Sequence, residues 1–272
     1  MFPTHADYTY PFGVPRTYFD PARVALIPLY PDYIADYHVH FLRYIYYMCY
    51  LNAEGSYPSE MTYEELEIML NDKVNSRCKP RIKKILIAEA PNVPATYFYN
   101  STVPFIGISP FTTAVRTCLF PGRMFINQVD FLMACAAEGF LLLDLFPYAI
   151  YGGYSNTGAN PYRNACKSAF CGIPYAYPIN IINTLNSLIC CIDDDLSLAF
   201  ALIRFGNPIL SDAACVTAIT TWLAINGKTL VPIGAVDIIR PMPIAGASNY
   251  LRVVGQAGPL GPSAGLLAAA GF

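Results

Sequence analysis

Short, continuous runs of apolar residues alternate with longer segments of helical periodicity along this chain. The runs 85–90 and 140–145 read Ile-Leu-Ile-Ala-Glu-Ala and Phe-Leu-Leu-Leu-Asp-Leu, and each reaches a proline within two residues. The runs 229–233 and 235–239 repeat the pattern, with prolines again close behind the second run. Apolar runs of this length, bounded by turn residues, predict strands that are buried on both faces.

Helical segments are expected between these runs, at 127–138, 180–204 and 210–225. Strands that alternate with helices predict an α/β fold with a mostly parallel central sheet flanked by helices. Ligands of such folds bind beyond the carboxyl ends of the strands. The residues in which we expect a site therefore follow the strands, at 89–99, 144–148 and 240–250.

The N-terminal part of the chain predicts helices rather than strands. Residues 31–51 begin with a proline and carry aromatic side chains on several faces, and Gly55 then breaks the pattern. Thr62 and Glu65 have the spacing of a capping box, so a second helix is expected from there to about Asp72. We divide the chain into an N-terminal arm and helical extension (1–79), an α/β domain (80–254) and an apolar C-terminal tail (255–272).

The composition adds an expectation about partners, because the chain has few charged side chains with which to cover its surface. Hydrophobic residues make up 54% of the chain and charged residues 13%, whereas a charged fraction of about 25% is usual. Residues 1–30 are rich in proline and aromatic residues, and 255–272 carry no charge. We therefore expect a homo-oligomer or larger protein assembly, in which partners cover apolar surface.

Nucleic-acid binding would have to be local. The chain has 17 Lys+Arg against 19 Asp+Glu and a net charge of -2, without the basic excess of proteins that grip phosphates. One basic cluster stands out. It is expected in the exposed start of a strand, with a phosphate-contact patch as the alternative, and it consists of Arg77, Lys79, Arg81, Lys83 and Lys84.

No segment predicts a membrane span. The best candidate, 131–150, contains Glu138, Asp144 and Pro147, whereas a spanning helix needs about 20 mainly apolar residues. The N-terminal residues lack the charged-then-apolar pattern of a signal peptide. We expect an intracellular protein, in the cytoplasm or, if the chain is viral, in a virus particle.

Metal and cofactor sites are not expected. The nine cysteines are scattered in apolar surroundings and predict buried, reduced thiols. Asp36, His38 and His40 alternate and could share one face of a strand, although partly buried histidines explain them better than a metal site. The run 193–195 is Asp-Asp-Asp, which is more typical of a solvated turn or helix start than of metal ligands.

The segments at the strand ends resemble the uracil-DNA glycosylase superfamily. Residues 85–91 (Ile-Leu-Ile-Ala-Glu-Ala-Pro), followed by 97–99 (Tyr-Phe-Tyr), resemble its first motif, a buried strand that runs into a Gly-Glu-Ala-Pro or Gly-Gln-Asp-Pro-Tyr loop. Residues 141–144 (Leu-Leu-Leu-Asp) resemble the strand that ends in the base-reading Asn. Residues 238–243 (Ile-Ile-Arg-Pro-Met-Pro) resemble the last strand and its His-Pro-Ser-Pro loop, so the resemblance covers roughly 80–255.

This resemblance implies a pocket that holds a base extruded from the DNA stack. The water-handling Asp or Asn of the family corresponds to Ala90, the base-reading Asn to Asp144 and the His to Arg240. An ionised Asp accepts hydrogen bonds only, and Arg cannot act as a neutral imidazole. The catalytic candidates are Glu89, as a substitute base, and Asp144. The candidates for binding a base or other ligand are Ala90, Pro91, Tyr97, Phe98, Tyr99, Arg240 and Asn249.

Three functions follow from these observations. The first is a glycosylase-like protein that still binds a base or nucleotide without excising uracil. The second is an active DNA glycosylase that excises a damaged or deaminated base with altered residues. The third is a structural or assembly protein on the same fold, such as a virus-particle component. We expect a non-enzymatic or weakly active protein in a multi-subunit assembly, with the active glycosylase as the alternative.

Overall fold

The computed structural model describes six stretches of the chain. They comprise residues 39–73, 79–88, 98–103, 110–144, 178–201 and 209–230. The predicted strand 235–239, the arm 1–30 and the tail 255–272 lie outside these residues.

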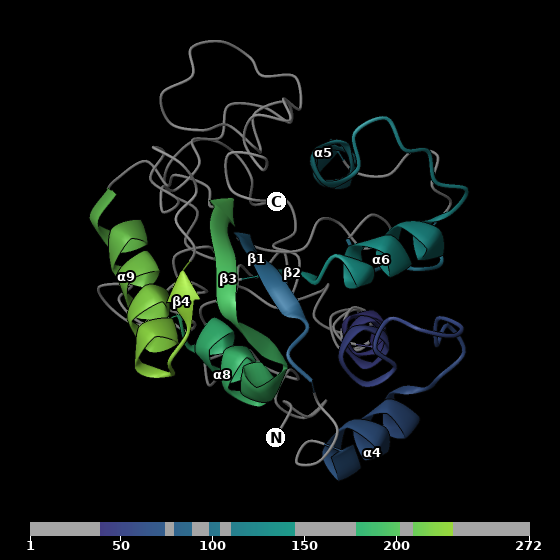
Figure 1. Cartoon of the computed structure of the whole chain (residues 1–272), viewed down its shortest axis with the longest axis horizontal. Helices are drawn as coiled ribbons and strands as arrows, with labels where there is room; N and C mark the ends of the chain where they lie inside the picture. Colours follow the sequence, from purple (N-terminus) through teal and green to yellow (C-terminus); the bar gives the residue numbers. More distant parts are fainter. Residues whose placement is uncertain are drawn as a thin grey trace, which may run out of the picture.

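A four-stranded, all-parallel sheet forms the centre of the described fold (Figure 1). Its spatial order is β2-β1-β3-β4. The strands are β1 (Ile82–Ala88), β2 (Phe140–Asp144), β3 (Ile192–Ala201) and β4 (Thr229–Leu230). The sheet and its helices confirm the predicted α/β class.

The two most apolar runs of the sequence are neighbouring strands. Residues 85–88 of β1 and all of β2 are buried. Lys84 aligns with Phe140 and Ala88 with Asp144, in an unshifted parallel register. Continuous burial is what strands covered on both faces require, and it explains why neither run shows the alternation of a half-exposed strand.

Helices flank both sides of this sheet. α6 (Gln128–Ala137) packs on β2 and on a helix that runs from 39 to 45 and continues as η3 (Tyr46–Tyr50). On the other side, α8 (Ile179–Leu188) packs on α9 (Ile209–Ile225), which leads into β4 (Figure 1). The remaining elements are α4 (Tyr63–Lys73), α5 (Pro110–Leu119) and η5 (Ile189–Cys191).

Several predicted helices are confirmed. α6 and α9 lie close to the expected 127–138 and 210–225, and residues 39–50 of the expected 31–51 are helical. The capping box before α4 is formed. The Thr62 N–H donates to Glu65 Oε2 at 2.8 Å, and the Glu65 N–H donates to Thr62 Oγ1 at 3.3 Å.

The prediction of one helix over 180–204 is wrong. The helix ends at Leu188, η5 follows, and residues 192–201 form β3. β3 lies between β1 and β4 and pairs with both. Residues 196–201 are mostly apolar and fit a buried strand as well as a helix, and here pairing with two neighbouring strands decided between them.

Two smaller expectations also need correction. His40 belongs to the helix 39–45, so it does not alternate along a strand with Asp36 and His38, which lie outside the described residues. The acidic run 193–195 is neither a turn nor a helix start, because it lies within β3.

An aromatic layer joins the N-terminal helix, the segment 98–103 and α6 to the edge of the sheet. The Tyr99 ring lies 4.8 Å from Tyr44 and 5.0 Å from Phe98, between ring centroids. Phe98 in turn lies 5.6 Å from Phe131 and 5.7 Å from Phe140. Tilted and edge-on contacts of this kind are the favoured geometry of aromatic pairs, so segments far apart in sequence share one core. Among the described helices, none is long and apolar enough to cross a membrane.

Candidate functional site

The strand order fixes where a ligand would bind in this fold. The chain passes from β1 to β2 on one side of the sheet and from β3 to β4 on the other. In open α/β sheets the crevice between two strands whose connections diverge in this way, at their carboxyl ends, is the usual ligand site. Here that position lies between the ends of β1 and β3, where Ala88 aligns with Ala201.

Asp144 lies in the same row of the sheet. It is the last residue of β2 and aligns with Ala88 of β1. Glu89, the other catalytic candidate, directly follows Ala88 in the sequence and lies outside the described residues. The Asp144 side chain is buried. Of the two carboxylate candidates, the structure thus places Asp144 at the carboxyl edge of the sheet.

Most of the other predicted site residues cannot be placed. Glu89, Ala90, Pro91, Tyr97, Arg240 and Asn249 lie outside the described residues. Their proposed roles therefore stay predictions.

Phe98 and Tyr99 are part of the hydrophobic core. Both side chains are buried, and their rings contact other core aromatic rings. A base could stack on either ring only if these packing contacts opened. In the described structure both residues join the sheet to the helices around it.

The Tyr99 hydroxyl makes a second contribution, because it caps the outer edge of β2. It donates to the Leu142 carbonyl oxygen at 2.6 Å and accepts from the Leu142 N–H at 2.9 Å. The Tyr44 hydroxyl donates to the carbonyl oxygen of Phe140 on the same edge. An edge strand carries a row of unpaired backbone groups, and these two hydroxyls satisfy three of them.

Burial holds these tyrosines in their neutral form. Burial raises the pKa of Tyr44 and Tyr99 well above the usual 10.0, and the nearby Asp144 carboxylate raises the pKa of Tyr99 further. Burial also raises the pKa of the Cys49 and Cys135 thiols. The neutral hydroxyl is the form that can donate to a carbonyl, so the edge cap requires it.

We expect the protein to lose stability steeply in alkali. The unfolded chain releases the thiol protons from about pH 9 and the tyrosine protons from about pH 10, whereas the folded state retains them. Stability is fully present below this window. Above it, each such group costs about 1.4 kcal/mol per pH unit until its folded pKa is reached. Urea midpoints measured from pH 7 to 11.5 would test this, and a midpoint that stays constant from pH 9 to 11 would contradict it.

A serine–histidine contact, not expected from the sequence, lies beside this edge. Ser101 Oγ is 3.0 Å from His40 Nδ1, and the Ser101 N–H donates to the same nitrogen at 3.4 Å. The Asn100 side chain shapes the turn, since its Oδ1 accepts from the N–H and the hydroxyl of Thr102 at 3.0 and 2.7 Å. His40 and Ser101 are 61 residues apart, and no motif in the sequence links them.

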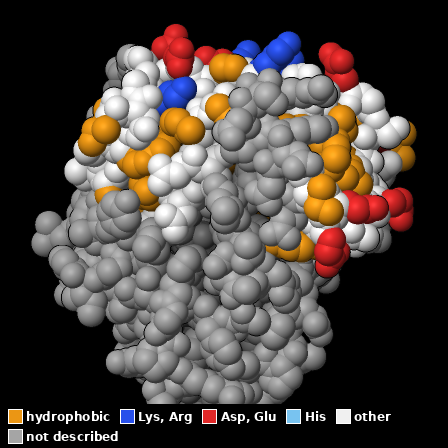
Figure 2. All heavy atoms as spheres, turned by 90° about the horizontal axis from the view of Figure 1, so that it is seen from below, with side chains coloured by type: hydrophobic (Ala, Val, Ile, Leu, Met, Phe, Trp, Pro, Cys, Tyr) orange, Lys and Arg blue, Asp and Glu red, His pale blue; other side chains and the backbone are white. Residues whose placement is uncertain are grey.

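The basic cluster lies at the opposite end of the sheet. Lys79, Arg81, Lys83 and Lys84 surround the start of β1, as predicted, and Arg77 lies outside the described residues. Acidic groups accompany them: Lys84 Nζ pairs with Glu138 Oε2 at 3.1 Å. On the face that Figure 2 shows, Lys and Arg side chains lie among Asp and Glu side chains. The phosphate-contact alternative would therefore act far from the carboxyl edge and against neighbouring carboxylates.

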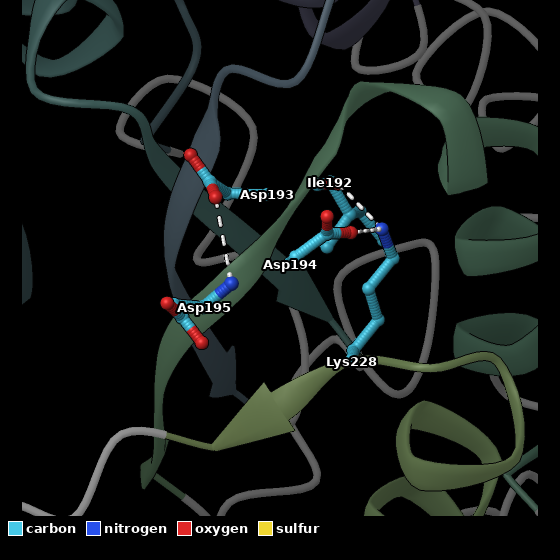
Figure 3. Close-up of polar contacts among 5 residues, drawn as sticks. All are labelled: Ile192, Asp193, Asp194, Asp195 and Lys228. Carbon is cyan, nitrogen blue, oxygen red and sulfur yellow. Dashed lines mark hydrogen bonds and ion pairs between the residues drawn. The ribbon is translucent and has the colours of Figure 1, made fainter.

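The start of β3, which contains the acidic run, is hydrogen-bonded to the residue that precedes β4. Lys228 Nζ donates to the Ile192 carbonyl oxygen at 2.8 Å and to Asp194 Oδ1 at 3.0 Å (Figure 3). Asp193 and Asp195 lie away from this lysine, and Asp193 Oδ1 accepts from the Asp195 N–H at 3.4 Å. Within the described stretches, no cluster of three His, Cys, Asp or Glu side chains could hold a metal ion.

Two substitutions separate the contributions that the two hydrogen bonds of Lys228 Nζ make to stability. The Asp194 side chain is 85% exposed, so we expect Asp194→Asn to cost a few tenths of a kcal/mol at most. Lys228→Met also removes the bond to the Ile192 carbonyl, and we expect it to cost about 1–2 kcal/mol. Urea unfolding of both variants would measure the difference. Equal losses would mean that the carbonyl contact contributes nothing.

The cysteines only partly match the prediction of reduced thiols. Cys49 and Cys135 are buried free thiols, and Cys190 is exposed. Cys191, by contrast, is disulfide-bonded. The spacing of the cysteines in the sequence does not predict which of them form disulfides. A disulfide depends on which side chains the fold brings together.

Comparisons with known protein families, characterised proteins and solved structures give no match for this chain.

Proposed function

We propose that this chain is a non-enzymatic or weakly active protein on a glycosylase-like α/β scaffold, and that it acts as a subunit of a larger assembly. The observation that carries the proposal is that the aromatic residues at the candidate site have structural contacts. Phe98 and Tyr99 pack in the core, and the Tyr99 hydroxyl is bonded to the backbone of Leu142. These groups stabilise a strand edge, which is a structural role.

The exposed side chains support an assembly in the same way. Met124 is 81% exposed and Ile126 90% exposed in the segment between α5 and α6, and Ile225 at the end of α9 is also exposed. Hydrophobic side chains appear in patches on the described surface (Figure 2). Large apolar residues that remain in water have a free-energy cost that a partner surface would remove. The low charged fraction of the sequence points the same way.

One observation favours the alternative, an active DNA glycosylase. The sheet register aligns Asp144 with Ala88, the residue before Glu89. With Asp144 as the base reader, the carboxylate of Glu89, which follows β1 in the sequence, could serve as the water-activating base. The burial of Asp144 suits a group that reads a ligand inside a pocket.

A paired measurement on one purified sample separates these functions. Light scattering gives the particle mass, and DNA that contains uracil, hypoxanthine or a mismatch is incubated with the protein, treated with alkali and resolved on a gel. A uniform particle of several subunits without strand breaks is the expected result. Deletion of 1–30 or of 255–272 is expected to change the particle mass.

Strand breaks, the result that would support the glycosylase, are checked with variants. Strand breaks that disappear in both Glu89→Gln and Asp144→Asn would replace the assembly proposal with the glycosylase. A matched variant, Asp194→Asn, changes an exposed carboxylate at the other end of the sheet and should leave any cleavage unaltered. A monomer in every variant, without cleavage, would refute both functions.

A further inference from the structure

The contact between His40 and Ser101 has the form of a base and a nucleophile. Ser101 lies in the turn 98–103 and is half-buried, whereas His40 comes from the helix 39–45 and is only 2% exposed. The Ser101 hydroxyl oxygen and His40 Nδ1 are 3.0 Å apart. This distance lies within the hydrogen-bond reach that general-base activation of a hydroxyl requires.

The contacts of His40 Nδ1 fit a tautomer in which this nitrogen accepts. A backbone N–H can only donate, and the Ser101 N–H points at His40 Nδ1 at 3.4 Å. An imidazole that carries its proton on Nε2 would present a lone pair at Nδ1 to both Ser101 groups. In that tautomer the Ser101 hydroxyl would donate its proton toward Nδ1. That is the direction in which a proton moves when a serine is activated by a histidine.

The pair lies beside the outer edge of β2. The Tyr44 hydroxyl reaches Phe140, the first residue of the strand, whereas the Phe41 ring contacts Tyr99 at 5.4 Å and the Tyr99 hydroxyl reaches Leu142. The start of the helix, with His40, thus points toward the end of the strand. Ser101 follows Tyr99 by two residues, and Asp144 follows Leu142 by two residues.

Both side chains are held firmly. His40 belongs to a helix whose next residues pack on the sheet edge. Ser101 stands between Tyr99, which is anchored by two hydrogen bonds, and Thr102, which is held by the buried Asn100 side chain. A nucleophile and base fixed in contact avoid the entropy cost of bringing them together during a reaction.

We propose that Ser101 is a nucleophile activated by His40, and that the pair transfers acyl groups from small esters. The Ser101 proton passes to His40 Nδ1 while Oγ forms a bond to the carbonyl carbon. The ester C–O bond then breaks, and the departing alcohol takes the proton from His40. Water, with His40 again as base, hydrolyses the acyl-serine and restores the hydroxyl. This activity goes beyond the assembly role and is separate from base excision, the only activity to which the word non-enzymatic in the proposed function refers.

The first experiment uses a fluorescent alkyl fluorophosphonate, which forms an Oγ–P bond as fluoride leaves. The full-length protein is treated, digested and mapped by mass spectrometry. We expect the label on Ser101, its loss in Ser101→Ala, and a labelling rate about 100-fold lower in His40→Asn. Asn can still accept the Ser101 N–H but is not a base. The matched control, Ser56→Ala, removes an exposed serine hydroxyl before α4 and should leave the labelling of Ser101 unchanged.

A second measurement guards against variants that fail to fold. The unmodified chain is labelled in buffer and in denaturing urea, and rapid labelling of Ser101 is expected only in the folded state. Hydrolysis of p-nitrophenyl acetate by the same samples should follow the labelling. No label on Ser101 of the folded protein, or an equal rate in a folded His40→Asn variant, would overturn the proposal. Neither result bears on particle mass or strand breaks, so this failure is separable from failure of the proposed function.

Discussion

Replacement of Gly139 with alanine is expected to cost more than about 4 kcal/mol of stability or to prevent folding. Gly139 stands between α6 and β2 with a φ of +68°. A Cβ on this residue would lie 2.2 Å from the Arg81 carbonyl oxygen and 3.1 Å from the Lys83 backbone nitrogen. Both of these atoms belong to the backbone, so the clash cannot be relieved by rotation of a side chain.

The position matters because it starts the pairing of β1 with β2. The Gly139 carbonyl oxygen accepts from the N–H groups of Lys83 and Lys84 at 2.9 and 3.1 Å. To admit a methyl group, the two strands would have to separate where their register begins. The loss therefore includes backbone hydrogen bonds of the central sheet as well as the left-handed strain.

Gly122 provides the matched control. Its φ is +75°, and a Cβ there would meet nothing within 4 Å. Gly122→Ala should therefore show the conformational strain alone, about 1–2 kcal/mol. Circular dichroism and urea unfolding of both variants measure the difference. Similar losses in the two variants would show that the close approach of Gly139 to Arg81 does not constrain the fold.

Tyr99→Phe is expected to cost about 2–4 kcal/mol, because it leaves two buried backbone groups without a partner. The phenylalanine ring would keep its contacts with Tyr44 and Phe98. Only the hydroxyl disappears, and with it the bonds to both the N–H and the carbonyl of Leu142. The effect should therefore appear locally, as faster hydrogen exchange of the Leu142 amide, and globally, as a lower urea midpoint.

Tyr50→Phe is the control for this change. The Tyr50 hydroxyl is buried, and among the described residues it has no hydrogen-bond partner. Its removal should change stability by less than about 0.5 kcal/mol or improve it slightly. If the two tyrosine variants lost stability equally, the edge cap would be refuted. If Tyr99→Phe lost stability without faster exchange at Leu142, the cost would arise elsewhere.

The fold class could be predicted because the strongest local patterns agree with the tertiary structure. The run that became β2 is buried at every position, and four successive apolar residues bounded by turn signals fit a buried strand. The capping box at Thr62 was equally readable, since all the groups that form it lie within four residues.

Part of the candidate site was also predictable. Residues that follow parallel strands meet at one edge, and the alignment of Asp144 with Ala88 agrees with that expectation. The roles of Phe98 and Tyr99 were not predictable in the same way. An aromatic residue that stacks on a ligand and one that packs in a core have the same sequence pattern, and only the surrounding side chains distinguish them.

The sequence by itself determined the parallel strands β1 and β2 and the helices α4, α6 and α9, because these depend on residues close together in the chain. Only the tertiary structure decided that residues 192–201 pair as a central strand, that Tyr99 caps the edge of β2, and that His40 meets Ser101. Each of these three features joins segments that are distant in sequence. Such contacts stabilise the protein only when the whole core assembles, so no local sequence pattern predicts them.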